Sequence, residues 1–116
     1  MTEQEAQAFA SEWIAAWNAH DLDAILGHYD DDFVMSSPFI AQLTNNSSGT
    51  LHGKRAVGNY WATALERYPE LHFELLHVLR GAASVTLIYQ GVGGLSAEVF
   101  RFGADGSITE AAAHYL

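Results

Sequence analysis

Apolar residues near the start of the chain recur at every third or fourth position, which is the period of an α-helix with one buried face. Thr2 is followed three residues later by Glu5, a spacing typical of a capping box at a helix N-terminus. We therefore expect an amphipathic helix over residues 3–19. Its apolar face carries three large aromatic residues, Phe9, Trp13 and Trp17.

Two further segments repeat the helical pattern. Asp21 is a residue type that caps helices, and the apolar residues after it predict a second helix that ends near Asp30. A third helix is expected from Lys54 onward, and Pro69 terminates it. The polar stretch 42–50 between them is rich in Asn, Ser and Gly and is expected to be a flexible loop.

The remaining segments have the composition of β-strands. A short strand is expected over residues 33–36, and Pro38, which lacks a backbone donor, ends it or places it at an edge. The second half of the chain is rich in β-branched and aromatic residues separated by Gly-containing turns. It predicts an antiparallel meander of four strands, over residues 71–80, 84–92, 96–102 and 107–116.

This order of elements predicts an α+β fold, in which three helices from the N-terminal half cover one face of a curved antiparallel or mixed sheet. An apolar pocket between such layers is a preferred place for a small-molecule site. Residues 85–89 are apolar on both strand faces, which favours a sheet covered on both sides. We therefore expect a homodimer that buries the outer sheet face.

The composition limits the partners. At 116 residues the chain has the size of one domain, and we expect residues 1–116 to form a single one. Fourteen acidic against five basic residues, a net charge of −9, disfavour nucleic acid and anionic membrane surfaces as partners. No apolar run is long enough to cross a bilayer, and the acidic N-terminus is unlike a secretory signal, so a cytoplasmic location is expected.

No metal site is expected, and the absence of cysteine excludes thiol catalysis. Asp30, Asp31 and Asp32 lack the alternating ligand spacing and central glycine of a calcium loop. They predict instead a solvated turn between the second helix and the first strand. The six histidines contain no His-x-His or His-x-x-x-His pair, which is the usual scaffold of a mononuclear metal site.

Several segments together resemble the nuclear transport factor 2-like superfamily, and within it the SnoaL-like group of polyketide cyclases and ketosteroid isomerase relatives. The resemblance implies a cone-shaped α+β barrel with a deep apolar pocket, usually dimeric through the outer sheet face. It does not imply one reaction, since members include isomerases, cyclases, dehydratases, epoxide hydrolases and non-catalytic proteins. The segments that carry it are residues 17–25, 29–33, 51–54, 98–102 and 105–106.

Residues 12–39 are similar to the corresponding stretch of ketosteroid isomerases without gaps. The tyrosine that donates to the oxyanion in those enzymes falls on Trp13, and the aspartate base falls on Ser37. A serine hydroxyl is too weakly basic to abstract a proton at neutral pH, and an indole is less acidic than a phenol. The isomerase mechanism is therefore not expected here in its usual form. The third member, an acid kept protonated in apolar surroundings, falls on Glu98.

Glu98 is the main catalytic candidate. The resemblance to polyketide cyclases implies a general acid/base in this neighbourhood, and burial between Ala97, Val99 and Phe100 would raise the pKa of the Glu98 carboxyl. The alternative is an outward Glu98 that pairs with a cation or water. Strand alternation decides between them, because an inward Glu98 requires Phe100 and Phe102 to face inward as well.

The last strand leaves a similar choice open. Alternation places Glu110 and His114 on one face and Ala111 and Tyr115 on the other, and the resemblance favours Ala111 and Tyr115 inside. His114 is a second catalytic candidate, because histidine is the commonest general acid or base.

The predicted ligand is a flat, apolar organic molecule, such as a polycyclic one, on which Glu98 would carry out cofactor-free proton transfer. The alternative is a non-catalytic protein of this fold that binds a ligand or another protein. An epoxide hydrolase would need an Asp-Arg-Asp constellation that the inward positions do not provide. The residues expected to contact the ligand are Trp13, Trp17, Tyr29, Phe33, Met35, Ser37, Trp61, Phe73, Phe100, Ala111 and Tyr115.

Overall fold

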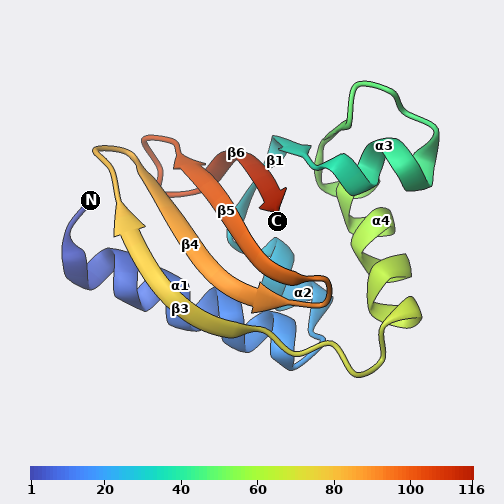
Figure 1. The fold of residues 1–116 in the computed structure, drawn as a ribbon. Coiled ribbons are helices and arrows are strands. Elements are labelled where there is room, and N and C mark those ends of the chain that lie inside the picture. The colour runs from blue at the N-terminus through green and yellow to red at the C-terminus, as the bar shows by residue number, and fades with distance from the viewer.

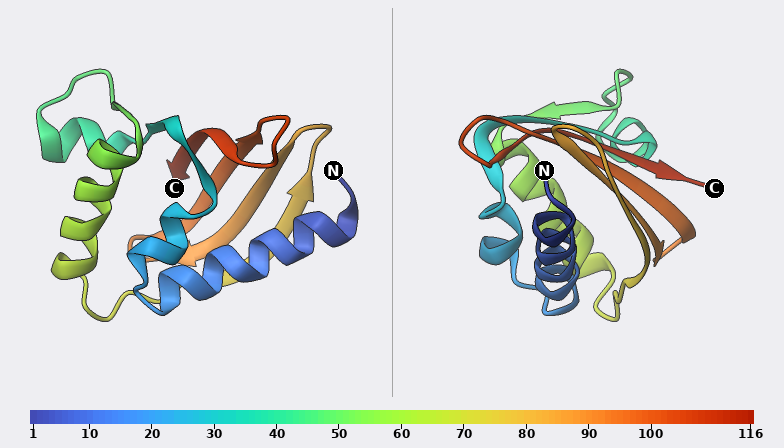
Figure 2. Two further views of the ribbon diagram at one scale, coloured as in Figure 1. Left: turned by 180° about the vertical axis from the view of Figure 1, so that it is seen from behind. Right: turned by 90° about the vertical axis from the view of Figure 1, so that its left-hand side faces the viewer.

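The computed structural model describes residues 1–116 as four helices and one six-stranded sheet. The sheet is curved and unclosed, and the helices lie on its concave side (Figures 1 and 2). The α+β fold class predicted from the sequence is therefore confirmed. The helices are α1 (Glu3–Asn18), α2 (Leu22–Leu26), α3 (Pro38–Thr44) and α4 (Lys54–Arg67). The strands are β1 (Tyr29–Ser36), β2 (Thr50–His52), β3 (Glu74–Arg80), β4 (Ser84–Gly91), β5 (Gly94–Phe102) and β6 (Ile108–Tyr115).

The strands follow the order β2-β1-β6-β5-β4-β3 across the sheet. Strands β3 to β6 form the predicted antiparallel meander. Strand β1 pairs with β6 in parallel, with Met35 opposite Ala111, so the last strand lies between β1 and β5. A parallel pair needs a long crossover connection, and here that connection includes α3, α4 and the whole of β3 to β5.

Helix α1 begins with the predicted capping box, in which Thr2 and Glu5 each accept a hydrogen bond from the other's backbone N–H. At its other end, Asn18 fixes the helix to the start of β3. The side chain of Asn18 donates to the carbonyl of Phe73 (3.0 Å) and accepts from the backbone N–H of Phe73 (2.6 Å). The aromatic face of α1 is thereby held against the concave side of the sheet.

The segment after β1 differs from the prediction, because part of the expected loop 42–50 belongs to a short helix, α3. Ser37 caps this helix by accepting a hydrogen bond from the N–H of Phe39 (3.2 Å), and Pro38 occupies the first turn. Proline suits that position because its missing N–H would have no intrahelical partner there. Pro38 therefore starts a helix, and the edge strand β2 follows the loop that remains.

The three aspartates lie in β1 and not in a turn before it, so that prediction was wrong in position. The pairing of β1 with β6 shifts register between Tyr29 and Val34, which leaves this part of the strand irregular. Asp31 and Asp32 are exposed, and Asp31 forms an ion pair with Lys54 at 3.5 Å. The expected solvation of these carboxylates is observed, although the strand extends through them.

The outer, convex face of the sheet is not covered by any helix (Figure 2). Leu76 and Leu79 on β3 and Leu95 on β5 are 39%, 57% and 39% exposed. Half-buried apolar residues such as Val99 lie between them on the same face. This face therefore exposes apolar side chains to water, interspersed with polar ones such as His77 and Arg101. None of the four helices combines the length and hydrophobicity needed to span a membrane.

Candidate functional site

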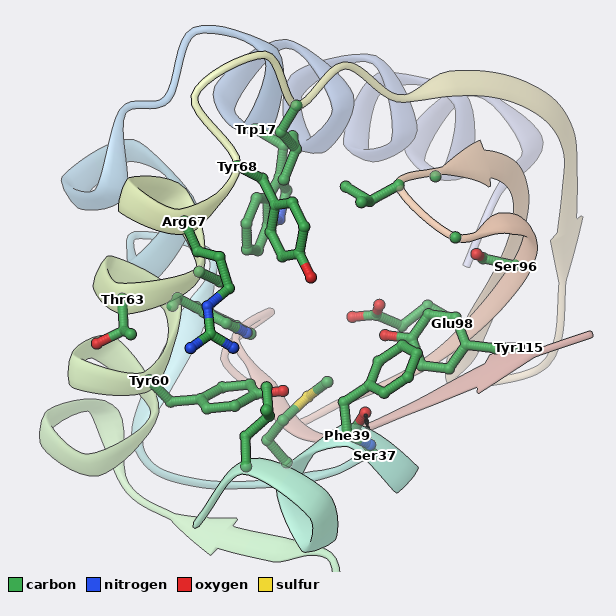
Figure 3. Close-up of a pocket in the computed structure, with 18 of the residues that line it drawn as sticks. Trp17, Ser37, Phe39, Tyr60, Thr63, Arg67, Tyr68, Ser96, Glu98 and Tyr115 are labelled. Carbon is green, nitrogen blue, oxygen red and sulfur yellow. Dashed lines mark hydrogen bonds between the residues drawn. The ribbon is translucent and has the colours of Figure 1, made fainter.

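A cavity of about 600 Å³ lies between the concave face of the sheet and helices α1, α3 and α4. Its walls are mainly apolar, and Trp17, Trp61 and Phe73 supply large parts of them. Figure 3 shows that several polar groups also point toward the middle of the cavity, among them the Glu98 carboxyl and the hydroxyl of Tyr68. An apolar cavity with a few convergent polar groups is the usual form of a small-molecule site.

The two tryptophans of α1 differ in how their N–H groups are satisfied. Trp13 stacks on Phe73 with ring centroids 5.7 Å apart, and its Nε1 donates to the hydroxyl of Tyr29 at 3.0 Å. Trp17 meets Trp61 edge to face at 5.3 Å, and its Nε1 is buried without a hydrogen-bond partner. The single N–H donor of the Trp13 side chain is therefore used inside the protein and is not available to a ligand.

Glu98 faces inward. Its side chain is only 4% exposed, and Phe100, two residues further along β5, is completely buried on the same face. Oε1 of Glu98 accepts a hydrogen bond from the hydroxyl of Tyr89 on β4 at 3.2 Å. The other carboxyl oxygen, Oε2, has no partner in the protein, and Glu98 lines the cavity. Oε2 is therefore the atom that can meet a ligand.

The surroundings of Glu98 favour its neutral form. Burial raises the pKa of the Glu98 carboxyl to about 7, although the hydrogen bond from Tyr89 acts in the opposite direction. Burial also raises the pKa of the Tyr89 phenol, and the nearby Glu98 charge raises it further, so Tyr89 remains a donor. No cation pairs with Glu98, since the ion pair of the structure joins Lys54 to Asp31. Glu98 can thus gain or lose its proton near neutral pH.

A second group of hydroxyls surrounds the N-terminus of α3. Ser37 is 5% exposed, and its side chain lies near the phenols of Tyr60 and Tyr115. Burial raises the pKa of both phenols, while the contact with Ser37 lowers it, so both stay protonated at neutral pH. The Tyr115 ring packs against Phe39 with centroids 4.4 Å apart. These hydroxyls can donate to a ligand oxygen.

Comparison with known proteins places this cavity in a family. The model of the SnoaL-like domain matches residues 10–111, which is most of the chain. The chain belongs to the SnoaL-like family. A SnoaL-like protein of unknown function from Burkholderia thailandensis is 53% identical, covers 99% of this chain and 97% of its own, and superimposes with a TM-score of 0.97.

More distant structures share the fold of this SnoaL-like domain. An NTF2-like protein of unknown function from Cytophaga hutchinsonii is 15% identical over 96% of this chain and 89% of its own, with a TM-score of 0.73. SalBIII, an epoxide hydrolase/cyclase-like enzyme with a role in pyran ring formation in the polyether salinomycin, is 17% identical over 98% and 92%, with a TM-score of 0.78. A comparison with proteins of curated function finds no match.

Most residues predicted to contact a ligand line the cavity of the SnoaL-like domain. These are Trp13, Trp17, Met35, Ser37, Trp61, Phe73 and Tyr115, together with the catalytic candidate Glu98. The others are buried but lie in the core behind the cavity wall, where they pack helices to sheet; they are Tyr29, Phe33, Phe100 and Ala111. Alternation in β6 placed Ala111 and Tyr115 on one face, and that face is the inner one, as the resemblance implied.

The histidines of the SnoaL-like domain do not gather at the cavity. His114 is exposed on the outer face, opposite Ala97 of β5, so the second catalytic candidate lies on the wrong side of the sheet for the cavity. His28 is half-buried against Phe9 at 5.4 Å, and this burial lowers the pKa of its imidazole. Nowhere do three His, Asp or Glu side chains come close enough together to hold a metal ion.

Several cavity residues were not predicted as ligand contacts from the sequence. Tyr60, Arg67 and Tyr68 line the cavity from α4 and the residue after it, and Phe39 lines it from α3. The spacing of Tyr60 and Tyr68 already marked them as one face of a helix, but it did not separate core from cavity. The signal for Phe39 was the Ser-Pro pair before it, which is typical of a helix start.

Proposed function

We propose that this SnoaL-like domain binds an apolar organic molecule in its cavity and transfers protons on it through Glu98, without a cofactor. The observation that carries the proposal is the geometry of Glu98. Its carboxyl is buried, faces a cavity walled by tryptophan and phenylalanine, and keeps Oε2 free. A carboxyl whose pKa of about 7 lies near the operating pH is suited to general acid/base work.

The proposed step is proton transfer next to a ligand carbonyl. The Glu98 carboxylate takes a proton from the adjacent carbon, and the electrons of that C–H bond move onto the carbonyl oxygen to give an enolate. Glu98, now a carboxylic acid, returns the proton to carbon or to oxygen. The phenols of Tyr60, Tyr68 and Tyr115 point into the same cavity (Figure 3) and are the donors available to the enolate oxygen.

Deuterium exchange provides a direct test. The α-protons of 2-tetralone, a bicyclic ketone, exchange with D₂O at a rate that NMR measures. Wild-type protein should accelerate this exchange, and Glu98→Gln should slow it by roughly 10²- to 10⁴-fold while the ketone still binds. The control is Glu110→Gln, because Glu110 is exposed on β6. Equal rates in wild-type protein and Glu98→Gln would remove Glu98 from the mechanism.

A second candidate function is binding without catalysis. It is favoured by the side chains that surround the cavity, because Glu98 is the only carboxyl among them and none of them is a histidine. Ser37 stands at the position of the aspartate base of ketosteroid isomerases, so the cavity lacks a second acid/base group that could act together with Glu98. Binding of 2-tetralone without accelerated exchange in the wild-type protein would support this second function.

We further propose that the protein forms a homodimer through the outer sheet face. The support is the row of exposed leucines on that face, Leu76, Leu79 and Leu95. A second copy would remove these side chains from water, and a two-fold axis lets the same patch serve both subunits. The cavity opens on the other side of the sheet, so such a dimer leaves it accessible.

A further inference from the structure

One cation lies at the cavity and has no partner. Arg67, in the last turn of α4, is the only lysine or arginine among the residues that line the cavity. No carboxylate pairs with it, because the ion pair of the structure is formed by Lys54 and Asp31. Its side chain also makes no hydrogen bond to another residue. A guanidinium carries five donors in a planar fork, so Arg67 presents unused binding capacity at this position.

The direction of the Arg67 side chain is informative. In Figure 3 its guanidinium lies between Tyr60 and Tyr68 at the edge of the cavity, across from Glu98. Tyr68 is 41% exposed and Arg67 is exposed, whereas Glu98 is almost fully buried. Arg67 therefore stands at the mouth of the cavity and Glu98 in its interior.

A purely structural role accounts for only part of this arrangement. A cation in the last turn of a helix interacts favourably with the helix dipole, and Arg67 can do so from its backbone position. That role does not require the guanidinium to be turned toward the cavity. It also predicts contacts with the carbonyls at the end of α4, and the Arg67 side chain makes none.

We propose that the cavity takes an apolar molecule with an anionic head group, a carboxylate in particular, and that Arg67 binds this group at the mouth. A guanidinium fork matches the two oxygens of a carboxylate, and the hydroxyls of Tyr60 and Tyr68 flank it as further donors. The apolar part of the molecule then lies along Trp17 and Trp61, with its far end near Glu98. The inference rests on the proposed ligand cavity but not on catalysis by Glu98.

The charge of the whole protein makes a local cation necessary for any anionic ligand. With a net charge of −9 the protein repels anions at long range, so an anionic ligand needs a local cation to offset this repulsion. Glu98, the one acidic residue of the cavity, lies in the interior, away from the mouth. An anion held at Arg67 is therefore kept apart from the only carboxyl group of the cavity.

Two fluorescent probes of nearly the same shape test the inference. 8-Anilinonaphthalene-1-sulfonate carries an anionic group, and N-phenyl-1-naphthylamine has the same ring skeleton without it; both brighten in apolar surroundings. Arg67→Gln should weaken binding of the sulfonate by about threefold to tenfold and leave the neutral probe within about twofold. Arg67→Lys should restore part of the loss, since it keeps the charge but not the fork.

Matched controls separate the site from general effects. Arg55→Gln removes an exposed arginine from the first turn of the same helix, away from the cavity, and should change neither affinity. Leu79→Gln makes the outer sheet face more polar and should also leave both probe affinities unchanged. That result would exclude binding of the probes to the outer face. Raising the salt concentration should weaken binding of the sulfonate probe and leave binding of the neutral probe unchanged.

Each remaining result overturns the inference. Equal loss of both probes in Arg67→Gln would assign Arg67 to the structure of the cavity, and unchanged sulfonate binding would leave it without a role in recognition. Failure of both probes to bind wild-type protein would remove the apolar site itself. The deuterium exchange of 2-tetralone, a neutral ketone, is independent of these results, so failure of the Glu98 mechanism can be told apart from failure of the Arg67 site.

Discussion

The hydroxyl of Tyr89 donates a hydrogen bond to Oε1 of Glu98 across 3.2 Å, and both side chains are buried. The two residues lie on neighbouring antiparallel strands, where Tyr89 is paired with Ser96 and Glu98 with Leu87. They are thus diagonal neighbours on the concave face, close enough for long side chains to meet. This bond orients the carboxyl, leaving Oε2 for the cavity, and it is the only protein hydrogen bond that the carboxyl has.

The first prediction concerns stability and pH. The pKa of Glu98 is about 7 in the folded protein and near its ordinary value of 4.5 when unfolded, so the unfolded state releases its proton first as the pH rises. The contribution of Glu98 to the free energy of unfolding is fully present below about pH 4.5. It is lost as the pH rises to about 7, which lowers the free energy of unfolding by about 3 kcal/mol. The side chain in Glu98→Gln stays neutral at every pH. In urea unfolding, the stability of this variant relative to wild type should therefore increase as the pH rises through this range. A constant difference between the two proteins would contradict the raised pKa; Glu110→Gln is the control.

The second prediction isolates the Tyr89 hydroxyl. Tyr89→Phe removes the one hydrogen bond that lowers the pKa of Glu98, so that pKa should rise above its wild-type value. The pH dependence of stability should shift upward with it, and NMR of the labelled Glu98 carboxyl carbon should follow the titration directly. Tyr68→Phe also removes a phenol from the cavity but has no bond to Glu98, and should leave the titration unchanged. An unshifted titration in Tyr89→Phe would show that this bond does not control the carboxyl.

A third prediction follows from the two bonds between Asn18 and the backbone of Phe73. Asn18→Ala leaves the N–H and C=O of Phe73 without these partners and should cost about 1–3 kcal/mol of unfolding free energy. Phe73 also walls the cavity, so binding of N-phenyl-1-naphthylamine should weaken in the same variant. Gln7→Ala is the matched control, since Gln7 is an exposed residue of α1 that makes no side-chain hydrogen bond and does not line the cavity. Wild-type stability in Asn18→Ala would show that water replaces both bonds without cost.

The fourth prediction tests the proposed dimer. Leu79→Lys places a charge at the most exposed leucine of the outer sheet face and should convert a dimer into a monomer, as measured by light scattering during size-exclusion chromatography. The circular dichroism spectrum should stay unchanged, because Leu79 is 57% exposed and contributes little to the core. Leu43→Lys alters a similarly exposed leucine on α3 and should leave the dimer intact. A monomeric wild-type protein at every concentration would refute the proposal.

Local patterns were enough to predict much of this fold. The capping box at Thr2 and the strand alternation around Glu98 depend only on residues a few positions apart, and the structure agrees with both. Alternation also predicted that Phe100 shares the face of Glu98 and that Tyr115 faces away from His114. These predictions agree with the structure because the position of each residue follows from the geometry of its own strand or helix.

The predictions failed where distant segments decide the local structure. The Asp30–Asp32 segment is polar enough to be a turn, but Tyr29 and Val34 on either side of it pair with β6, and the strand continues through it. His114 has the chemistry of a catalytic group, yet the face it occupies is fixed by the pairing of β6 with β5. Arg67 was not predicted as a site residue, because a sequence does not indicate which way a long side chain at a helix end turns.

The position of β6 between β1 and β5 has a consequence for how the protein folds. Strand β1 cannot complete its pairing until β6 has been synthesised, because Val34, Met35 and Ser36 pair with β2 on one side and with β6 on the other. Contacts so far apart in sequence raise the contact order and slow the search for the native state. We therefore expect the aromatic side chains of β1 to be the last part of the core to become protected, and the growing chain to remain exposed to chaperones until β6 has been synthesised.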